Sequence, residues 1–203
     1  MNLAGNIQAN RSIPAIDSAA RNQQQFLKFT IQPGLMALIE IECVMELVNI
    51  PIDRVVPMPH LPPAVRGVYN WRGEILWIVD LAMLLGVGGG ERYRKVQPTI
   101  VFSSAGRKIR QSPQHLPARA ATAVATPQTI GFIVDEIVEI ELCQLDLSSG
   151  SLPEHLHPEL AQSIQGVWES PTGEDFLVLD GSAILDRANV HTDARSDLNY
   201  FFR

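Results

Sequence analysis

The stretch GVYNWRGEILWIVDLAMLL, residues 67 to 85, decides the fold because a second stretch repeats its pattern later in the chain. The second stretch reads GVWESPTGEDFLVLDGSAIL, residues 166 to 185. Both begin with Gly-Val and an aromatic residue, and Asp80 matches Asp180. Two apolar runs around a glycine-containing turn predict a β-hairpin in each copy, followed by a short helix after the aspartate.

The repeat extends upstream of the hairpins. VMELV, residues 44 to 48, resembles IVEIE, residues 137 to 141, so Glu46 corresponds to Glu139. A duplicated unit of short strands with glycine and proline punctuation is typical of small barrels or sandwiches. Residues 75 to 79 are apolar without alternation, which predicts a strand covered on both faces by an interface between the two units.

Other short apolar runs complete the list of predicted strands. Pro33-Gly34 joins two of them as a hairpin turn, and residues 81 to 86 indicate a short helix that ends at Gly86. The remaining strands are expected at residues 26–31, 35–41, 44–50, 96–102 and 129–142.

Composition changes mark the limits of the folded domain. We expect a disordered N-terminal arm at 1–24, one domain at 25–188 and a polar C-terminal tail at 189–203. A basic, flexible insertion is expected at about 103–128, because no Asp or Glu occurs between Glu91 and Asp135. The net charge of -6 argues against bulk binding to nucleic acid or membrane. Without a signal peptide or a run of ~18 apolar residues, a cytoplasmic location is expected.

Residues that could carry chemistry have simpler interpretations. Asp80 and Asp180 are expected to cap helices rather than to form a catalytic pair. His155 and His157 are too few for a metal site, and Ser182 lacks a nucleophile-elbow pattern. The two cysteines lie far apart and belong to no Cys-x-x-Cys pair, which favours buried free thiols. The sequence therefore predicts no catalytic residue, no metal and no cofactor.

Three motifs together resemble the CheW-type coupling proteins of bacterial chemosensory systems. They are HLPPAVRGVYNWRGEILWIVDLAMLLG, GFIVDEIVEI and IQGVWE followed by FLVLD, and the resemblance spans Phe26 to Arg187. It implies an all-β fold of two intertwined SH3-like five-stranded β-barrels, packed side by side with short helical connections. Trp71 and Trp77 depart from the residues usual in this family at those positions.

The resemblance also implies a function and partners. Such proteins are non-enzymatic adaptors that bridge the cytoplasmic tip of a chemoreceptor and the regulatory domain of a CheA-type histidine kinase, within membrane-associated arrays. The implied receptor-binding groove contains an Arg72–Glu46 pair at its hairpin and comprises Val44, Met45, Glu46, Arg72, Phe132, Val134 and Asp135. The candidate kinase contact comprises Leu85, Val96, Thr99 and Val101.

Two alternatives belong to other functional classes. An SH3-like module could bind nucleic acid through the basic segment 103–128, although this segment offers no aromatic residue on which bases could stack. A hydrolase that uses carboxylates such as Asp80 would require an open cleft with these carboxylates exposed. The sequence alone leaves both alternatives open.

Overall fold

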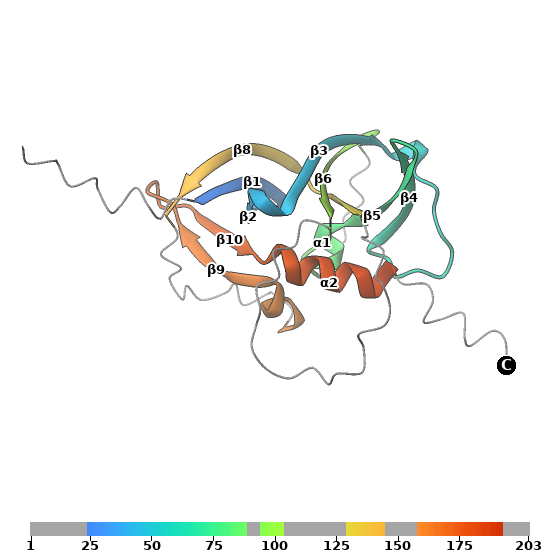
Figure 1. The fold of residues 1–203 in the computed structure, drawn as a ribbon. Helices are drawn as coiled ribbons and strands as arrows, with labels where there is room; N and C mark the ends of the chain where they lie inside the picture. Colours follow the sequence, from blue (N-terminus) through green and yellow to red (C-terminus); the bar gives the residue numbers. More distant parts are fainter. Residues whose placement is uncertain (1–23, 89–93, 104–128, 145–157, 193–203) are drawn as a thin grey trace, which may run out of the picture.

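The computed structural model describes residues 24–88, 94–103, 129–144 and 158–192. The described chain is all-β, with two five-stranded sheets joined by short helical segments (Figure 1). The predicted N-terminal arm, the insertion at 103–128 and the C-terminal tail lie almost wholly outside the described residues.

Sheet A takes its strands from both ends of the chain. Their order across the sheet is β8-β1-β2-β10-β9, and all neighbours are antiparallel except β10 and β2, which are parallel. The strands are β1 (Gln24–Gln32), β2 (Leu35–Glu40), β8 (Glu136–Cys143), β9 (Ile164–Glu169) and β10 (Asp175–Leu179).

Sheet B is built from the middle of the chain. Its order is β3-β6-β7-β5-β4, again antiparallel except for one parallel pair, β5 and β7. The strands are β3 (Val44–Pro51), β4 (Val65–Trp71), β5 (Glu74–Asp80), β6 (Val96–Ser103) and β7 (Thr129–Ile133). Order and directions match sheet A strand for strand, with β3 in the place of β8, so the duplicated unit that the sequence predicts is present.

The two sheets are not the two halves of the sequence. β1 and β2 pair with strands from the C-terminal part, and β7 inserts between β6 and β5. Each sheet therefore depends on backbone hydrogen bonds between residues far apart in the chain. The two sheets are therefore intertwined along the chain, as the resemblance implies.

Both predicted helices follow their capping aspartates. α1 (Leu81–Leu84) begins after Asp80, whose Oδ1 accepts a hydrogen bond from the amide of Met83 at 3.1 Å. α2 (Gly181–Thr192) begins after Asp180, whose Oδ1 accepts from the amides of Ser182 and Ala183. The prediction of N-caps is confirmed. The remaining helical segments are 3₁₀ turns: η2 (Ile41–Cys43), η3 (Ile52–Arg54) and η5 (Pro158–Ser163).

Three apolar clusters hold the sheets together. One lies on the face of sheet A that carries Phe26 and Phe176, and one lies on the face of sheet B that carries Leu76 and Ile78. The third and largest, which we call the central cluster, joins residues of both sheets, α1 and α2. The strand β5 is thus covered on both faces, as predicted, except at its start, where Ile75 is 71% exposed. Ile75 is exposed because it lies beside the hairpin turn, beyond the reach of the central cluster.

The backbone pairing is that of two open sheets. Among the described strands, no ladder joins β8 to β9 or β3 to β4, so the closed barrels implied by the resemblance stay a prediction. Within the described part of the chain, no helix is long and apolar enough to cross a membrane.

Candidate functional site

The β4–β5 turn positions the first candidate pair. Arg72 and Gly73 both have positive φ, 56° and 86°, as a two-residue hairpin turn of the right twist requires. Arginine rarely adopts this conformation, so the turn holds Arg72 at some conformational cost. The amide of Gly73 donates to Asn70 Oδ1 at 3.1 Å, which fixes the turn from the strand side.

The Arg72 guanidinium reaches across to the edge strand β3. Its Nη2 donates to Glu46 Oε1 at 2.8 Å, and its Cζ lies 4.9 Å from the centre of the Trp71 ring. The pairing that the resemblance implies is therefore present in the structure. Because the Arg72 side chain is 66% exposed, the ion pair contributes little to stability but presents an ordered guanidinium at the surface.

The other predicted groove residues divide into exposed and buried ones. Met45 is 56% exposed, and Val44 is half-buried against the central cluster. Phe132 and Val134 are buried, so they support this surface from below and offer no contact themselves. The structure thus brings only part of the predicted set to the surface.

Asp135 lies where the two sheets meet. Its amide donates to the carbonyl of Thr30 in β1, while the preceding amide, that of Val134, donates to the carbonyl of Pro98 in β6. Arg94 holds the same corner, since Nη1 donates to the Asp135 carbonyl at 2.8 Å and Nη2 lies 3.3 Å from Oδ1. Sequence reasoning missed Arg94, because a contact across 41 positions leaves no local pattern.

Comparison with known proteins agrees with this geometry. The family model described as "CheW-like domain" matches residues 25–189. The chain belongs to the CheW-like domain family. Proteins of this family are chemotaxis scaffolds or adaptors. Among solved structures, the fold is similar to that of the scaffolding protein TtCheW from Thermoanaerobacter tengcongensis, with a TM-score of 0.56 and 17% identity over 78% of this chain and 84% of that one. No curated protein sequence matches.

The structure adds residues to the surface expected of a CheW-like domain. β3 and β8 are equivalent edge strands, and each has an irregular register at the same place, at Met45 and at Val138. Figure 1 shows the two strands arching along the same side of the molecule. We call their exposed apolar side chains, apart from Leu142 at the end of β8, the edge-strand surface: Met45, Leu47, Val138 and Ile140. The only sequence signal for this surface was the match of VMELV with IVEIE. The structure shows that both stretches expose apolar side chains at an edge of a sheet.

Most of the candidate kinase contacts are buried in this CheW-like domain. Leu85 packs in the central cluster, and Val101 belongs to the cluster of sheet B. Thr99 is wholly buried, because it packs against Gly131, where a Cβ would lie 2.9 Å from the Thr99 methyl group. Of the predicted set only Val96 is exposed, at 46%.

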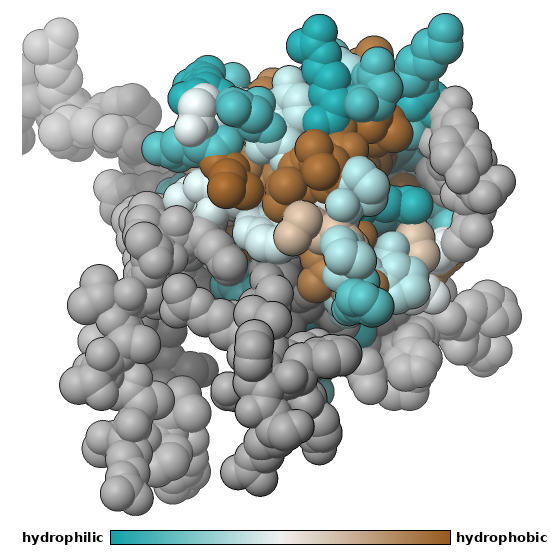
Figure 2. All heavy atoms as spheres, turned by 90° about the vertical axis from the view of Figure 1, so that its right-hand side faces the viewer, coloured by the Kyte–Doolittle hydropathy of each residue, from teal (hydrophilic) through white to brown (hydrophobic). Residues whose placement is uncertain are grey.

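A second exposed apolar surface lies on sheet B. Val56 forms an isolated bridge with Val68 of β4, and Val68 faces Trp77 of β5, so these side chains form one row. Figure 2 shows apolar side chains gathered near the middle of this end of the molecule, with hydrophilic ones around them. We call its exposed residues the β4 surface: Val56, Met58 and Ile75.

Both cysteines are free, as predicted. Cys143 is buried in the cluster of sheet A, whereas Cys43 is only half-buried beside Gly181. Burial raises the pKa of the Cys43 thiol to about 11, with smaller contributions from Glu40, Asp180 and Glu42. His155, His157 and the basic segment behind the nucleic-acid alternative lie outside the described residues.

Proposed function

We propose that this chain is a non-enzymatic adaptor that bridges the cytoplasmic tip of a chemoreceptor and the regulatory domain of a CheA-type histidine kinase. The observation that carries the proposal is the pair of equivalent edge strands with exposed apolar side chains, of which β3 also holds the Arg72–Glu46 pair. An exposed apolar surface bordered by charged groups is typical of a protein-binding site.

The edge-strand surface is the proposed receptor site. A chemoreceptor tip is helical, and an amphipathic helix binds by placing its apolar side chains against such a surface. Met45 and Ile140 would contact the apolar face of the helix, and Arg72 would contact a polar group at its border. Asp135, held by Arg94, would fix the corner between the sheets against which the helix packs.

The kinase site is proposed on sheet B. Of the residues predicted from the sequence, only Val96 has the exposure that a contact requires, and the β4 surface adds Val56, Met58 and Ile75. We assign the kinase to this part because β3 and β4 are opposite edges of sheet B, so a receptor on β3 and a kinase on β4 could be bound together with the β4–β5 hairpin between them. The buried Thr99 and Val101 would act only by shaping the sheet, and Leu85, which follows α1, only by packing in the central cluster.

The proposal also covers the barrel shape of each sheet and the place of the protein in the cell. Each sheet would behave as an SH3-like barrel whose edges are joined by side chains, as Arg72 and Glu46 join β4–β5 to β3. Binding to receptor tips would recruit the protein to membrane-associated arrays.

The test uses one substitution on each surface. Ile140→Glu is expected to weaken binding to a purified receptor tip fragment and to leave binding to the kinase regulatory domain unchanged. Ile75→Glu is expected to do the opposite. Both side chains are more than half exposed, so neither change should impair folding. If the unmodified chain binds neither partner in a pull-down, the adaptor function is rejected; if both variants bind like the unmodified chain, the two surfaces are wrongly assigned.

A further inference from the structure

Positive charge is scarce in sheet A. The sequence contains no Lys or Arg between Arg119 and Arg187, and Lys28 is the only such residue in the strands of this sheet. The carboxylates on the same strands are Glu40, Glu136, Glu139, Glu141, Glu169 and Asp175. This imbalance favours a positively charged partner.

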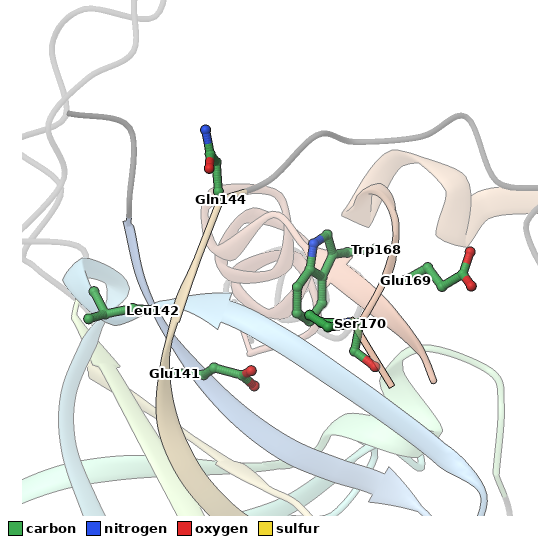
Figure 3. A pocket seen from close by; sticks show the side chains of 7 residues that line it. Glu141, Leu142, Gln144, Trp168, Glu169 and Ser170 are labelled. Carbon is green, nitrogen blue, oxygen red and sulfur yellow. The ribbon is translucent and has the colours of Figure 1, made fainter. Parts of the chain in front are cut away.

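A pocket opens between the two edge strands of sheet A. Its volume is about 420 Å³, and its lining comes from the end of β8 and from β9 with the turn that follows. In Figure 3 the Glu141 carboxylate points from β8 toward the β9–β10 hairpin and the Trp168 ring stands across from it, whereas Leu142 and Glu169 point away. The lining residues are Glu141, Leu142, Gln144, Trp168, Glu169, Ser170 and Pro171.

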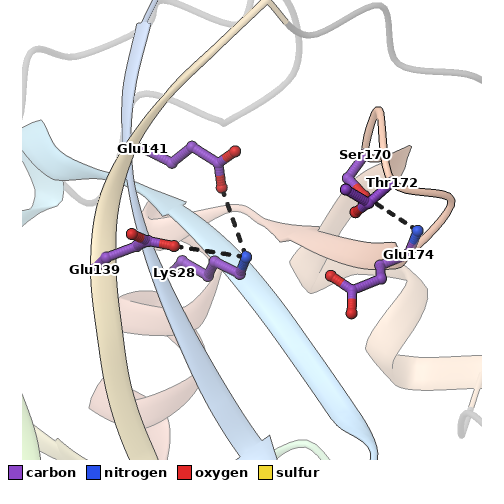
Figure 4. Close-up of polar contacts among 6 residues, drawn as sticks. All are labelled: Lys28, Glu139, Glu141, Ser170, Thr172 and Glu174. Atoms are coloured by element: carbon purple, nitrogen blue, oxygen red, sulfur yellow. Dashed lines mark hydrogen bonds and ion pairs between the residues drawn. The ribbon is translucent and has the colours of Figure 1, made fainter.

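Glu141 lacks a full set of partners. Its Oε2 atom is buried without a hydrogen-bond partner in the described part of the chain. The cation beside it, Lys28 Nζ, is 3.8 Å away and is shared with Glu139 at the same distance (Figure 4). Lys28 also lies 4.7 Å from the centre of the Phe176 ring. One cation thus serves two carboxylates, and because Oε2 is closed to solvent, the exposed third of the Glu141 side chain is the part that a ligand can reach.

A similar group of residues in sheet B shows what such a site accepts. There Arg72 extends from the hairpin turn, pairs with Glu46 and lies over the Trp71 ring. Glu139 occupies the position of Glu46, as the register of β8 and β3 shows.

The corresponding turn of sheet A, residues 170–173, supplies no cation. Its Ser170 hydroxyl is bonded to that of Thr172 at 2.7 Å and accepts from the Glu174 amide at 3.0 Å, so the turn is held by its own contacts (Figure 4).

We propose that this pocket binds the guanidinium of an arginine carried on an extended segment of a partner protein. The guanidinium pairs with Glu141 and lies against the exposed edge of Trp168, whose ring is otherwise buried beside Phe176. The arrangement resembles that of Arg72 with Glu46 and Trp71 in sheet B, although the residues are not equivalent ones, because Glu46 matches Glu139 and Tyr69 matches Trp168. Arginine fits better than lysine, because its planar group can stack on an aromatic ring and donate several hydrogen bonds at once. Glu141 points to the other face of β8 from Ile140, so the pocket adjoins the edge-strand surface at Leu142 and is distinct from the β4 surface.

The test uses a blocked Gly-Arg-Gly peptide and the full chain. The indole N–H signal of Trp168, assigned by its loss in Trp168→Phe, is expected to shift in a saturable way on addition of the peptide. The same peptide with citrulline in place of arginine, which keeps the shape without the charge, should cause no shift. Glu141→Gln should weaken the affinity about fivefold, as expected for a partly exposed ion pair. Glu136→Gln, on the same strand but outside the pocket, should leave it unchanged.

A second variant tests the site independently of Glu141. Ser170→Arg places a guanidinium beside the pocket that Ser170 lines and should abolish the peptide shift by filling it. Ser170→Ala, which removes the same turn contacts without adding a cation, should leave the shift in place. An equal shift with citrulline, or unchanged affinity in both Glu141→Gln and Ser170→Arg, overturns the proposal. The proposal is also overturned if replacing Arg107, Lys108, Arg110 and Arg119 by Gln shifts the Trp168 signal in the absence of peptide. The occupant of the pocket would then be this chain itself.

Discussion

Glu46 and Glu139 occupy equivalent positions in the two sheets, yet each receives its cation from a different element. Glu46 is paired with Arg72 from a hairpin turn, whereas Glu139 is paired with Lys28 from the neighbouring strand. The first arrangement presents the cation at the surface, with 66% of the Arg72 side chain exposed, and the second covers it, with 15% of Lys28 exposed. The duplicated fold has therefore given equivalent glutamates different roles.

Removing the Arg72 guanidinium should affect binding more than stability. Arg72→Asn suits a positive φ, so the turn should form, and the free energy of unfolding should change by less than about 1 kcal/mol. Affinity for a receptor tip fragment should fall about tenfold, corresponding to ~1.4 kcal/mol. Titration calorimetry and chemical unfolding measure the two effects. Arg54→Ala, another exposed arginine, serves as the control, and unchanged receptor affinity in Arg72→Asn would remove Arg72 from the site.

The edge-strand surface should be sensitive to charge on either strand. Leu47→Glu and Ile140→Glu lie at equivalent positions of β3 and β8, so each should weaken receptor binding to a similar degree. The reason is that a carboxylate cannot be desolvated against an apolar helix face without a partner. Binding of a fluorescent receptor peptide measures the effect. A loss confined to one strand would show that the helix contacts that strand alone.

Gly67 should tolerate no side chain. Its φ is 137°, and a Cβ built there would overlap the Val56 carbonyl and lie 2.9 Å from the Cα of Pro57. Gly67→Ala should lower the free energy of unfolding by about 3 kcal/mol, through backbone strain together with overpacking. Gly34→Ala is the matched control, because Gly34 also has positive φ but open space around it, so only about 1 kcal/mol should be lost. Similar losses in both, measured by urea unfolding, would mean that the contact with Val56 is unimportant.

The Asp80 side chain should contribute to the stability of the fold in two separable ways. Its Oδ1 caps α1, and its Oδ2 accepts from Arg66 Nη2 at 2.7 Å. Asp80→Asn keeps an N-cap acceptor and loses the ion pair, whereas Asp80→Ala loses both, so Asp80→Ala should be less stable by about a further 1 kcal/mol. Thermal unfolding of the two variants measures this difference. Equal stability would show that the cap contributes nothing.

The thiols should make the fold sensitive to alkaline pH. The pKa values of Cys43 and Cys143 are each raised from 9.0 to about 11, mainly by burial, so the folded state keeps protons that the unfolded chain releases. Stability should therefore be intact below pH 9 and should decrease as pH rises from 9 to about 11. Cys143→Ala should reduce this decrease. Alkylation by iodoacetamide at pH 8 should be slow in the native protein and fast in urea; fast alkylation of both thiols in the native state would contradict this assignment.

The sequence by itself determined the local structure and the repeat. The strand-turn-strand pattern of residues 67–80 and 166–179, the capping aspartates and the Pro33-Gly34 turn depend on periodicity and turn chemistry within a few residues, so they were predicted correctly. The match of Glu46 with Glu139 was also readable, because a duplicated unit preserves its pattern.

The tertiary structure alone decided which strands pair, and therefore which side chains are exposed. β1 and β2 join C-terminal strands through hydrogen bonds that any extended backbone can make, so no local pattern specifies the partner. In the same way, β6 lies between β3 and β7, which buries Thr99 and Val101 inside sheet B, whereas β8 lies at an edge of sheet A and leaves Ile140 54% exposed. The burial of a side chain depends on what packs against it from other strands, and a short stretch of sequence does not specify those neighbours.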